Sequence, residues 1–132
     1  MLYGPNIIAV KENDTTDMIC SSTETIYTEA YKLDRGSVFG VAYKCASVNG
    51  TPDITIVVEQ GYQAPTSKEA SDSTFVTPAN MSDVCTRRTT ENTLVIQSLS
   101  PVVMPWIRFA ITGLGSNNAD TVVNVWLAIQ EQ

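Results

Sequence analysis

The sequence predicts one all-β domain over residues 1–132, an antiparallel β-sandwich of jelly-roll type with seven or eight strands and one long irregular loop. Three observations predict this fold class. Apolar and polar residues alternate with a period of two along several segments. Gly, Pro, Asn and Asp gather between those segments, where turns need them. Charged residues make up only 17% of the chain, and Thr, Ser, Asn and Gln, which suit sheet surfaces and loops, replace them.

The N-terminal part supplies the first expected strands. Residues 6–10 and 17–21 are short apolar runs. Residues 24–33 begin with four residues of high β-propensity. Their second half also fits the start of a helix, but the Gly-containing turn at 34–36 favours a strand. Residues 37–47 alternate regularly and carry Gly40 and Ala42 on one face, which predicts the close approach of another sheet or another chain.

The middle of the chain continues the pattern. Asn49 and Gly50 form a turn signal that predicts a hairpin between residues 37–47 and 53–60. In the second of these strands Ile54, Ile56 and Val58 point to one side and are expected to face the core. Residues 93–99 form the next expected strand.

The last two expected strands are residues 105–112 and 121–130. Pro105 can begin a strand but cannot lie within one. The loop 113–120 is rich in Gly and Asn and predicts that these two strands form an antiparallel pair. Asn117, Asn118 and Asp120 carry oxygen ligands suited to calcium, but turn formation explains them better.

Residues 61–92 depart from the strand pattern. This stretch is rich in Ser, Thr, Asp, Pro and Ala and holds only isolated apolar residues. Long irregular connections are uncommon inside compact domains and are usually functional. We therefore expect an arm that lies across its own sheet or reaches a neighbouring chain. We also expect removal of residues 68–82 to leave the domain folded.

The residue types give little support to catalysis. The chain contains no histidine, which removes the commonest general base, the commonest neutral metal ligand and every His-based nucleophilic triad. A pair of carboxylates is a remaining route to hydrolysis. Glu59, on a central strand, is the acid that merits attention, although an outward structural role is the favoured interpretation. We predict no enzyme activity, no catalytic or metal-ligating residues and no cofactor.

The charge and the cysteine content limit which classes of partner and which cellular compartment we expect. The net charge is −6 and the largest basic cluster is Arg87–Arg88, so we expect no nucleic-acid partner. The N-terminus has no basic and apolar leader, and no apolar stretch approaches the roughly 20 residues that span a bilayer. We expect synthesis in a reducing cytoplasm and no membrane partner. Cys20, Cys45 and Cys85 are expected to be free thiols, with Cys20 and Cys45 buried in strands, and a disulfide is the less favoured alternative.

Function is therefore expected at surfaces. Trp106 and Trp126 lie on the outward sides of the last two strands. Exposed Trp and Tyr side chains stack on sugar rings, so a non-catalytic carbohydrate- or ligand-binding module is one interpretation. Burial in the core or in a subunit contact is the favoured one. The candidate interface residues are Tyr62, Phe75, Met81, Arg87, Arg88, Trp106, Arg108 and Trp126.

Three segments carry a resemblance to a known family. They are residues 49–53 leading into a strand, Leu99–Pro101 followed by residues 105–109, and Thr112–Gly113 followed by residues 117–127. Together they resemble small β-sandwich structural proteins of tailed bacteriophages, of the capsid decoration or related virion type. The resemblance covers about residues 37–132. It implies a virion location, a contact with the major capsid protein or another virion protein, and a homo-oligomer, with a trimer favoured.

Overall fold

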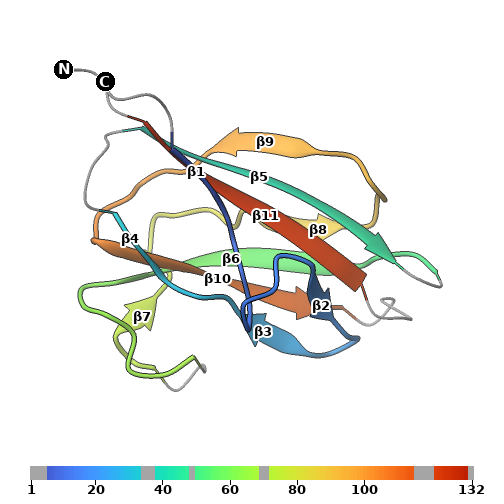
Figure 1. The fold of residues 1–132 in the computed structure, drawn as a ribbon, viewed down its shortest axis with the longest axis horizontal. Coiled ribbons are helices and arrows are strands. Elements are labelled where there is room, and N and C mark those ends of the chain that lie inside the picture. The colour runs from blue at the N-terminus through green and yellow to red at the C-terminus, as the bar shows by residue number, and fades with distance from the viewer. Residues whose placement is uncertain (1–5, 34–37, 48–49, 69–71, 115–120, 131–132) are drawn as a thin grey trace.

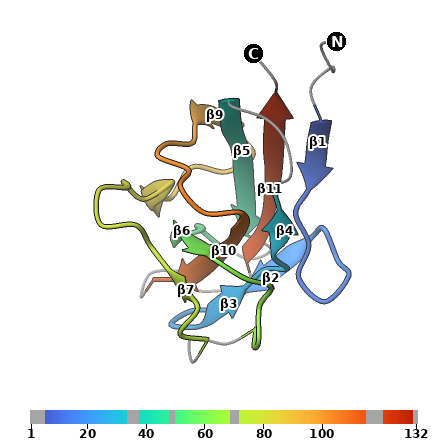
Figure 2. The ribbon, with the colours of Figure 1, turned by 90° about the vertical axis from the view of Figure 1, so that its left-hand side faces the viewer.

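Two antiparallel β-sheets, packed face to face, make up the described structure, which contains no helix (Figures 1 and 2). A computed structural model describes residues 6–33, 38–47, 50–68, 72–114 and 121–130. The β-sandwich predicted from the alternating pattern is confirmed. No helix in the described residues is long and apolar enough to cross a membrane.

The first sheet is built around its two longest strands, β5 (Val38–Ser47) and β11 (Thr121–Gln130), which pair along their whole length. On the far side of β11 lie β1 (Asn6–Ala9) and β2 (Met18–Cys20), which pair with different parts of the same strand. On the far side of β5 lies β9 (Val95–Ser98). Figure 2 shows β9, β5, β11 and β1 side by side in this order.

The second sheet is built around β6 (Ile54–Gly61) and β10 (Trp106–Gly113), again paired along their whole length. Two short strands, β3 (Thr25–Tyr27) and β4 (Tyr31–Lys32), share the free side of β10. Two more, β7 (Phe75–Val76) and β8 (Cys85–Arg88), share the free side of β6.

The strand order is that of a jelly roll. The eleven described strands fill eight positions, because β1 with β2, β3 with β4, and β7 with β8 each share one. Counted along the chain, positions 1, 8, 3 and 6 form the first sheet and positions 2, 7, 4 and 5 form the second. Eight strands wound into two sheets in this way are a jelly roll, as the sequence predicted.

The predicted hairpins are wrong. β5 and β6 lie in opposite sheets, and so do β10 and β11, so neither pair is hydrogen-bonded. The same holds for β4 and β5, which flank the turn predicted at 34–36. The turn residues 34–36, Asn49 and residues 115–120 themselves lie outside the described residues. Alternation identifies the buried face of a strand but not its sheet, so a connection that crosses the core gives the same sequence signal as a hairpin.

The core lies between the sheets and consists of the side chains that the alternation predicted to face inward. Tyr43 and Phe109 are the aromatic members, one from each sheet. The other inward-facing core residues of the four long strands are Val41, Cys45, Ile54, Ile56, Val58, Ile107, Ile111, Val123, Val125 and Leu127. Cys20 and Cys85 are also buried, and all three cysteines are free thiols, as predicted.

The segment 61–92 is more ordered than its composition predicted. It contributes β7 and β8 to the edge of the second sheet, so it lies across its own sheet, one of the two arrangements expected. Phe75 and Met81 are buried, and Met81 belongs to the core. The expectation that removal of residues 68–82 leaves the domain folded rested on there being few core side chains in that stretch. Phe75 and Met81 are buried within it, and the expectation itself stays a prediction.

Candidate functional site

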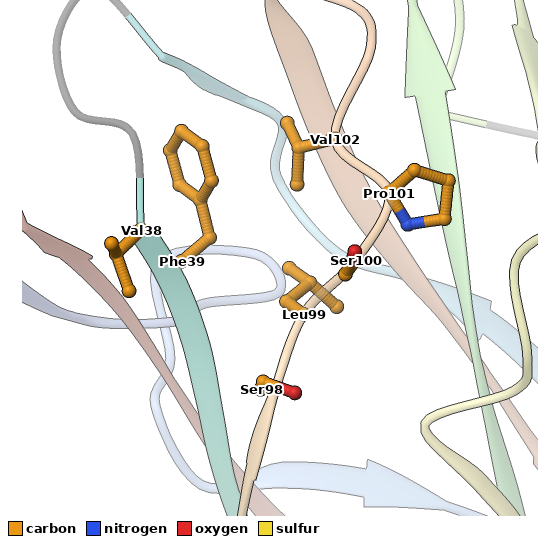
Figure 3. Close-up of a pocket in the computed structure, with 7 residues that line it drawn as sticks. All are labelled: Val38, Phe39, Ser98, Leu99, Ser100, Pro101 and Val102. Atoms are coloured by element: carbon orange, nitrogen blue, oxygen red, sulfur yellow. The ribbon is translucent and has the colours of Figure 1, made fainter.

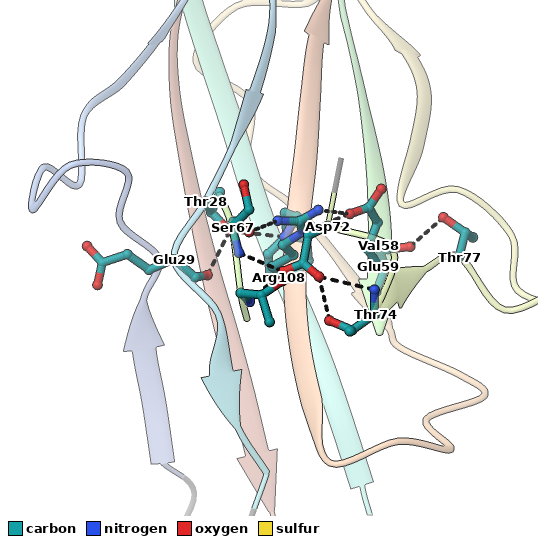
Figure 4. A network of polar contacts seen from close by, with 11 residues as sticks. Thr28, Glu29, Val58, Glu59, Ser67, Asp72, Thr74, Thr77 and Arg108 are labelled. Carbon is teal, nitrogen blue, oxygen red and sulfur yellow. Dashed lines mark hydrogen bonds and ion pairs between the residues drawn. The ribbon is translucent and has the colours of Figure 1, made fainter. Parts of the chain in front are cut away.

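A buried arginine organises the outer face of the second sheet. Arg108 points outward from β10, where it pairs with Glu59 of β6, yet only 1% of the residue is exposed. Its Nε donates to Glu59 Oε1 at 2.8 Å, its Nη2 lies 2.7 Å from the same oxygen, and its Nη1 donates to the Ser67 carbonyl at 3.1 Å (Figure 4). The segment after β6 thus closes over a charge that the sequence placed on the surface.

Two aromatic rings complete the surroundings of this guanidinium. Its central carbon lies 4.7 Å from the centroid of Tyr27 and 4.9 Å from that of Phe75. Both distances suit cation–π contacts. Phe75 reaches this position because its neighbour on β6 is Gly61, and a Cβ there would lie 2.7 Å from the Phe75 ring.

Asp72 fixes the segment that covers Arg108. Its carboxylate accepts hydrogen bonds from the backbone N–H groups of Thr66, Ser67 and Thr74, at 2.7, 2.9 and 3.1 Å, and from the Thr74 hydroxyl (Figure 4). The Thr74 hydroxyl and these N–H groups stabilise the ionised form, which lowers the pKa of Asp72 against the opposing effect of burial. Thr77 then ties the segment to β6 by donating to the Val58 carbonyl at 2.8 Å.

Gln60 holds the connection between β9 and β10 against the end of β6. The side chain is buried, and its Nε2 donates to the Pro101 carbonyl at 2.8 Å. Its Oε1 accepts from the N–H groups of Val103 and Met104 at 3.0 and 3.1 Å. The exposed side chains of Tyr62, Val103 and Met104 therefore gather at this end of the sheet, and we call these three residues the β6 patch.

The basic pair Arg87–Arg88 has structural contacts. Arg87 donates to both carboxylate oxygens of the buried Asp53, from Nε at 2.9 Å and from Nη2 at 3.1 Å. Arg88 is half-buried and donates from Nη2 to the Thr93 carbonyl at 3.4 Å. Each arginine therefore braces the sheet edge formed by β8.

The carboxylates and thiols of the described core and sheet edges have structural contacts. Glu59, Asp53 and Asp72 are held by the partners described above. Burial raises the pKa of Cys20 to about 12 and that of Cys45 to about 11, and it also raises the pKa of Cys85, so the nucleophilic thiolate is disfavoured at each. Among the described residues no cluster of three or more His, Cys, Asp or Glu side chains is placed to hold a metal ion.

Two hollows open on the surface of the described structure. One, of about 280 Å³, adjoins Arg108 and is bordered by Glu29 and Lys68. The other, of about 390 Å³, lies between the start of β5 and the chain leaving β9 (Figure 3). Its lining is mainly apolar and consists of Val38, Phe39, Ser98, Leu99, Ser100, Pro101 and Val102.

The outer face of the first sheet is mainly apolar, and none of the described segments packs over its centre. The pairing register places side chains in rows across it, because directly opposed residues of antiparallel strands point to the same side. One row runs Ala9–Trp126–Ala42–Ile96 and the next runs Ile7–Ala128–Gly40–Ser98. Ile96 is 75% exposed and Ile7 is 63% exposed. We call this surface the open face; its other outward residues are Ile19, Val38, Lys44, Ala46, Val122, Asn124 and Gln130.

The predicted interface residues do not form one site. Phe75, Met81 and Arg108 are buried within the subunit, whereas Tyr62 is exposed in the β6 patch. Trp106 is half-buried at the start of β10, opposite Gly61 and beside that patch. Trp126, also half-buried, lies in the middle of the open face. Arg87 and Arg88 lie on β8, away from both tryptophans.

Sequence reasoning missed several residues that define these surfaces. Ile7, Ile19 and Ile96 lie on strands of three or four residues, too short for alternation to assign an outward side. Gln60 and Asp72 carried no signal beyond being polar. Their roles depend on chain segments that meet only in the folded protein.

Comparison with known proteins does not identify a family. No family model matches the chain, and no curated protein matches it significantly.

Proposed function

We propose that the protein is a non-catalytic structural subunit of a virion, a capsid decoration or cement protein that binds and stabilises the head surface. The proposal combines the resemblance of residues 37–132 to phage structural proteins with the jelly-roll fold, an architecture that capsid proteins and lectins use. The fold alone assigns no function, so the support for this function has to come from the surfaces of the protein.

The observation that carries it is the placement of exposed apolar residues on two separate surfaces, the open face and the β6 patch. A subunit that joins an assembly needs contact surfaces, whereas an enzyme needs a cavity in which reactive groups converge. Glu59, the one acid that suggested hydrolysis, is neutralised by the buried Arg108. Repetition of modest contacts over a lattice would give such a subunit high avidity.

The experiment is co-sedimentation of the protein with empty heads. The heads are assembled from the major capsid protein whose gene lies nearest to the gene of this protein. We expect saturable binding at a fixed number of copies per head. We also expect heads carrying the protein to resist heating to a higher temperature than bare heads. Absence of binding to these heads, with the protein folded by circular dichroism, would contradict the proposal.

The second candidate is a carbohydrate-binding module, which the half-exposed Trp126 on a flat sheet face favours. A sugar ring would stack on that indole and protect it. A glycan array read together with quenching of Trp126 fluorescence separates the two candidates. Binding of any glycan with matching protection of Trp126 would favour the module over the structural subunit.

A further inference from the structure

We propose that a second copy of this chain occupies the open face, so that two subunits pair through their first sheets about a two-fold axis. The pairing goes beyond the proposed function and does not depend on it. Four properties of the open face indicate a second copy as its partner. They are its small side chains, its area, its shape complementarity to itself and its charge.

The first property is a group of small residues that no described segment of the chain covers. Gly40 and Ala42 predicted the close approach of another sheet or another chain. A Cβ on Gly40 would meet only the Gln97 carbonyl at 3.5 Å and the Ala128 Cβ at 3.8 Å, both from neighbouring strands of the same sheet. No other part of the described chain supplies the predicted contact.

The second property is size. β5 and β11 are each 10 residues long, which corresponds to about 33 Å at about 3.3 Å per residue. The outer strands β1, β2 and β9 are shorter, with 4, 3 and 4 residues. With strands spaced by about 4.8 Å, the five strands give a flat footprint of about 500 Å² per copy, or about 1,000 Å² for a pair, which is the smallest area expected of a specific protein interface.

The third property is a surface shape that is complementary to itself. A two-fold axis parallel to the strands, between β11 and β5, places each row of the face opposite its own reversed copy. The row Ala9–Trp126–Ala42–Ile96 then sets Trp126 against Ala42 and Ile96 against Ala9, a large side chain against a small one at both positions. In the next row Ile7 meets Ser98 and Ala128 meets Gly40. The same residues serve both copies, as a two-fold interface requires.

The fourth property is charge. Two chains of net charge −6 repel each other, but the strands of the open face contribute a single formal charge, Lys44. Lys44 pairs in register with Asn124, whose Nδ2 donates to Asp17 Oδ1 at 2.8 Å. The same two-fold axis brings Lys44 of one copy to Asn124 and Asp17 of the other. Each pair of subunits thus gains two opposite-charge contacts at the rim of an apolar centre.

Sedimentation velocity of the full chain over a concentration series tests the pairing. The mass should rise with concentration from that of one 14.3-kDa chain to twice that value. Ile96→Lys should raise the dissociation constant by at least about tenfold, because it places a charge in the contact. The control Val76→Lys changes another strongly exposed apolar residue, on β7 of the other sheet, and should leave the dissociation constant unchanged.

A charge exchange tests the orientation of the two copies. Lys44→Glu should weaken pairing, and Lys44→Glu combined with Asp17→Lys should restore it, while circular dichroism confirms that each variant is folded. The proposal would be overturned if the protein were a monomer at every concentration, or a trimer. It would also be overturned if Ile96→Lys and Val76→Lys had equal effects, or if the double exchange did not restore pairing. A monomer that binds heads contradicts only the pairing, and a dimer that does not bind them contradicts only the proposed function.

Discussion

The ion pair between Arg108 and Glu59 offers the sharpest test of how the segment 61–92 is held on the second sheet. Glu59→Gln keeps the size of the side chain but removes the charge that neutralises a guanidinium only 1% exposed. Removing one partner of a buried pair costs about 3–5 kcal/mol. Because the Glu59 side chain is 19% exposed, we expect a cost just below that range, about 2–3 kcal/mol.

Urea denaturation followed by circular dichroism measures this cost. With a slope of about 2 kcal/mol per molar urea, the midpoint of Glu59→Gln should fall by about 1–1.5 M. Arg108→Met keeps an apolar stem between Tyr27 and Phe75 and should cost less. The double variant Glu59→Gln/Arg108→Met should be more stable than the sum of the single effects predicts, by at least about 1 kcal/mol.

The exposed ion pair between Lys68 and Glu12 is the matched control. Its nitrogen–oxygen distance is 3.2 Å, but 43% of the Lys68 side chain is exposed, so Lys68→Met should cost less than about 1 kcal/mol. If Glu59→Gln costs no more than Lys68→Met, or if the Glu59 and Arg108 effects simply add, the buried pair does not hold the segment and the reasoning fails.

Three further predictions follow from the same contacts. Gly61→Ala should destabilise the fold by about 1–3 kcal/mol, because its Cβ would overlap Phe75, whereas Gly40→Ala, which meets only ordinary contacts, should be close to neutral in the same urea titration. Asp72 has a pKa below its ordinary value of 3.8, so its carboxylate stabilises the folded state above that pH and loses this effect as the pH falls towards the folded pKa. The stability gap between the wild type and Asp72→Asn should therefore be full at pH 6 and shrink below about pH 4, and a gap independent of pH would contradict the assignment. Burial should protect all three cysteines from Ellman's reagent at pH 8 in the folded protein, whereas all three should react in urea; a thiol that reacts at the unfolded rate would show that its strand is not closed.

The fold class and the core were accessible to sequence reasoning because strand alternation has a strict period of two. Ile54, Ile56 and Val58 face the core as the pattern predicted, and so do the inward residues of β5, β10 and β11. The pattern did not reveal which strands pair. In this jelly roll most successive strands lie in opposite sheets, and nothing local to Asn49–Gly50 separates a crossing from a hairpin.

The surfaces were harder to predict because they depend on contacts between distant residues. Arg108 is buried by Tyr27 from β3 and by Ser67 and Phe75 from the segment 61–92, two parts of the chain that are distant from it in sequence. The sequence predicted part of the open face, because the alternation assigned Gly40, Ala42 and Trp126 to the outward sides of their strands. Ile7 and Ile96 complete it only through the register of their strands with β11 and β5.

The proposed pairing of two copies through the open face can be followed at Trp126. In a Trp106→Phe variant this indole is the only tryptophan, and it lies in the middle of the open face. Acrylamide quenching should fall as the protein concentration rises, in step with the mass measured by sedimentation, because the second copy covers the indole. Quenching that stays constant while the mass doubles would show that the contact lies elsewhere and would contradict pairing through the open face.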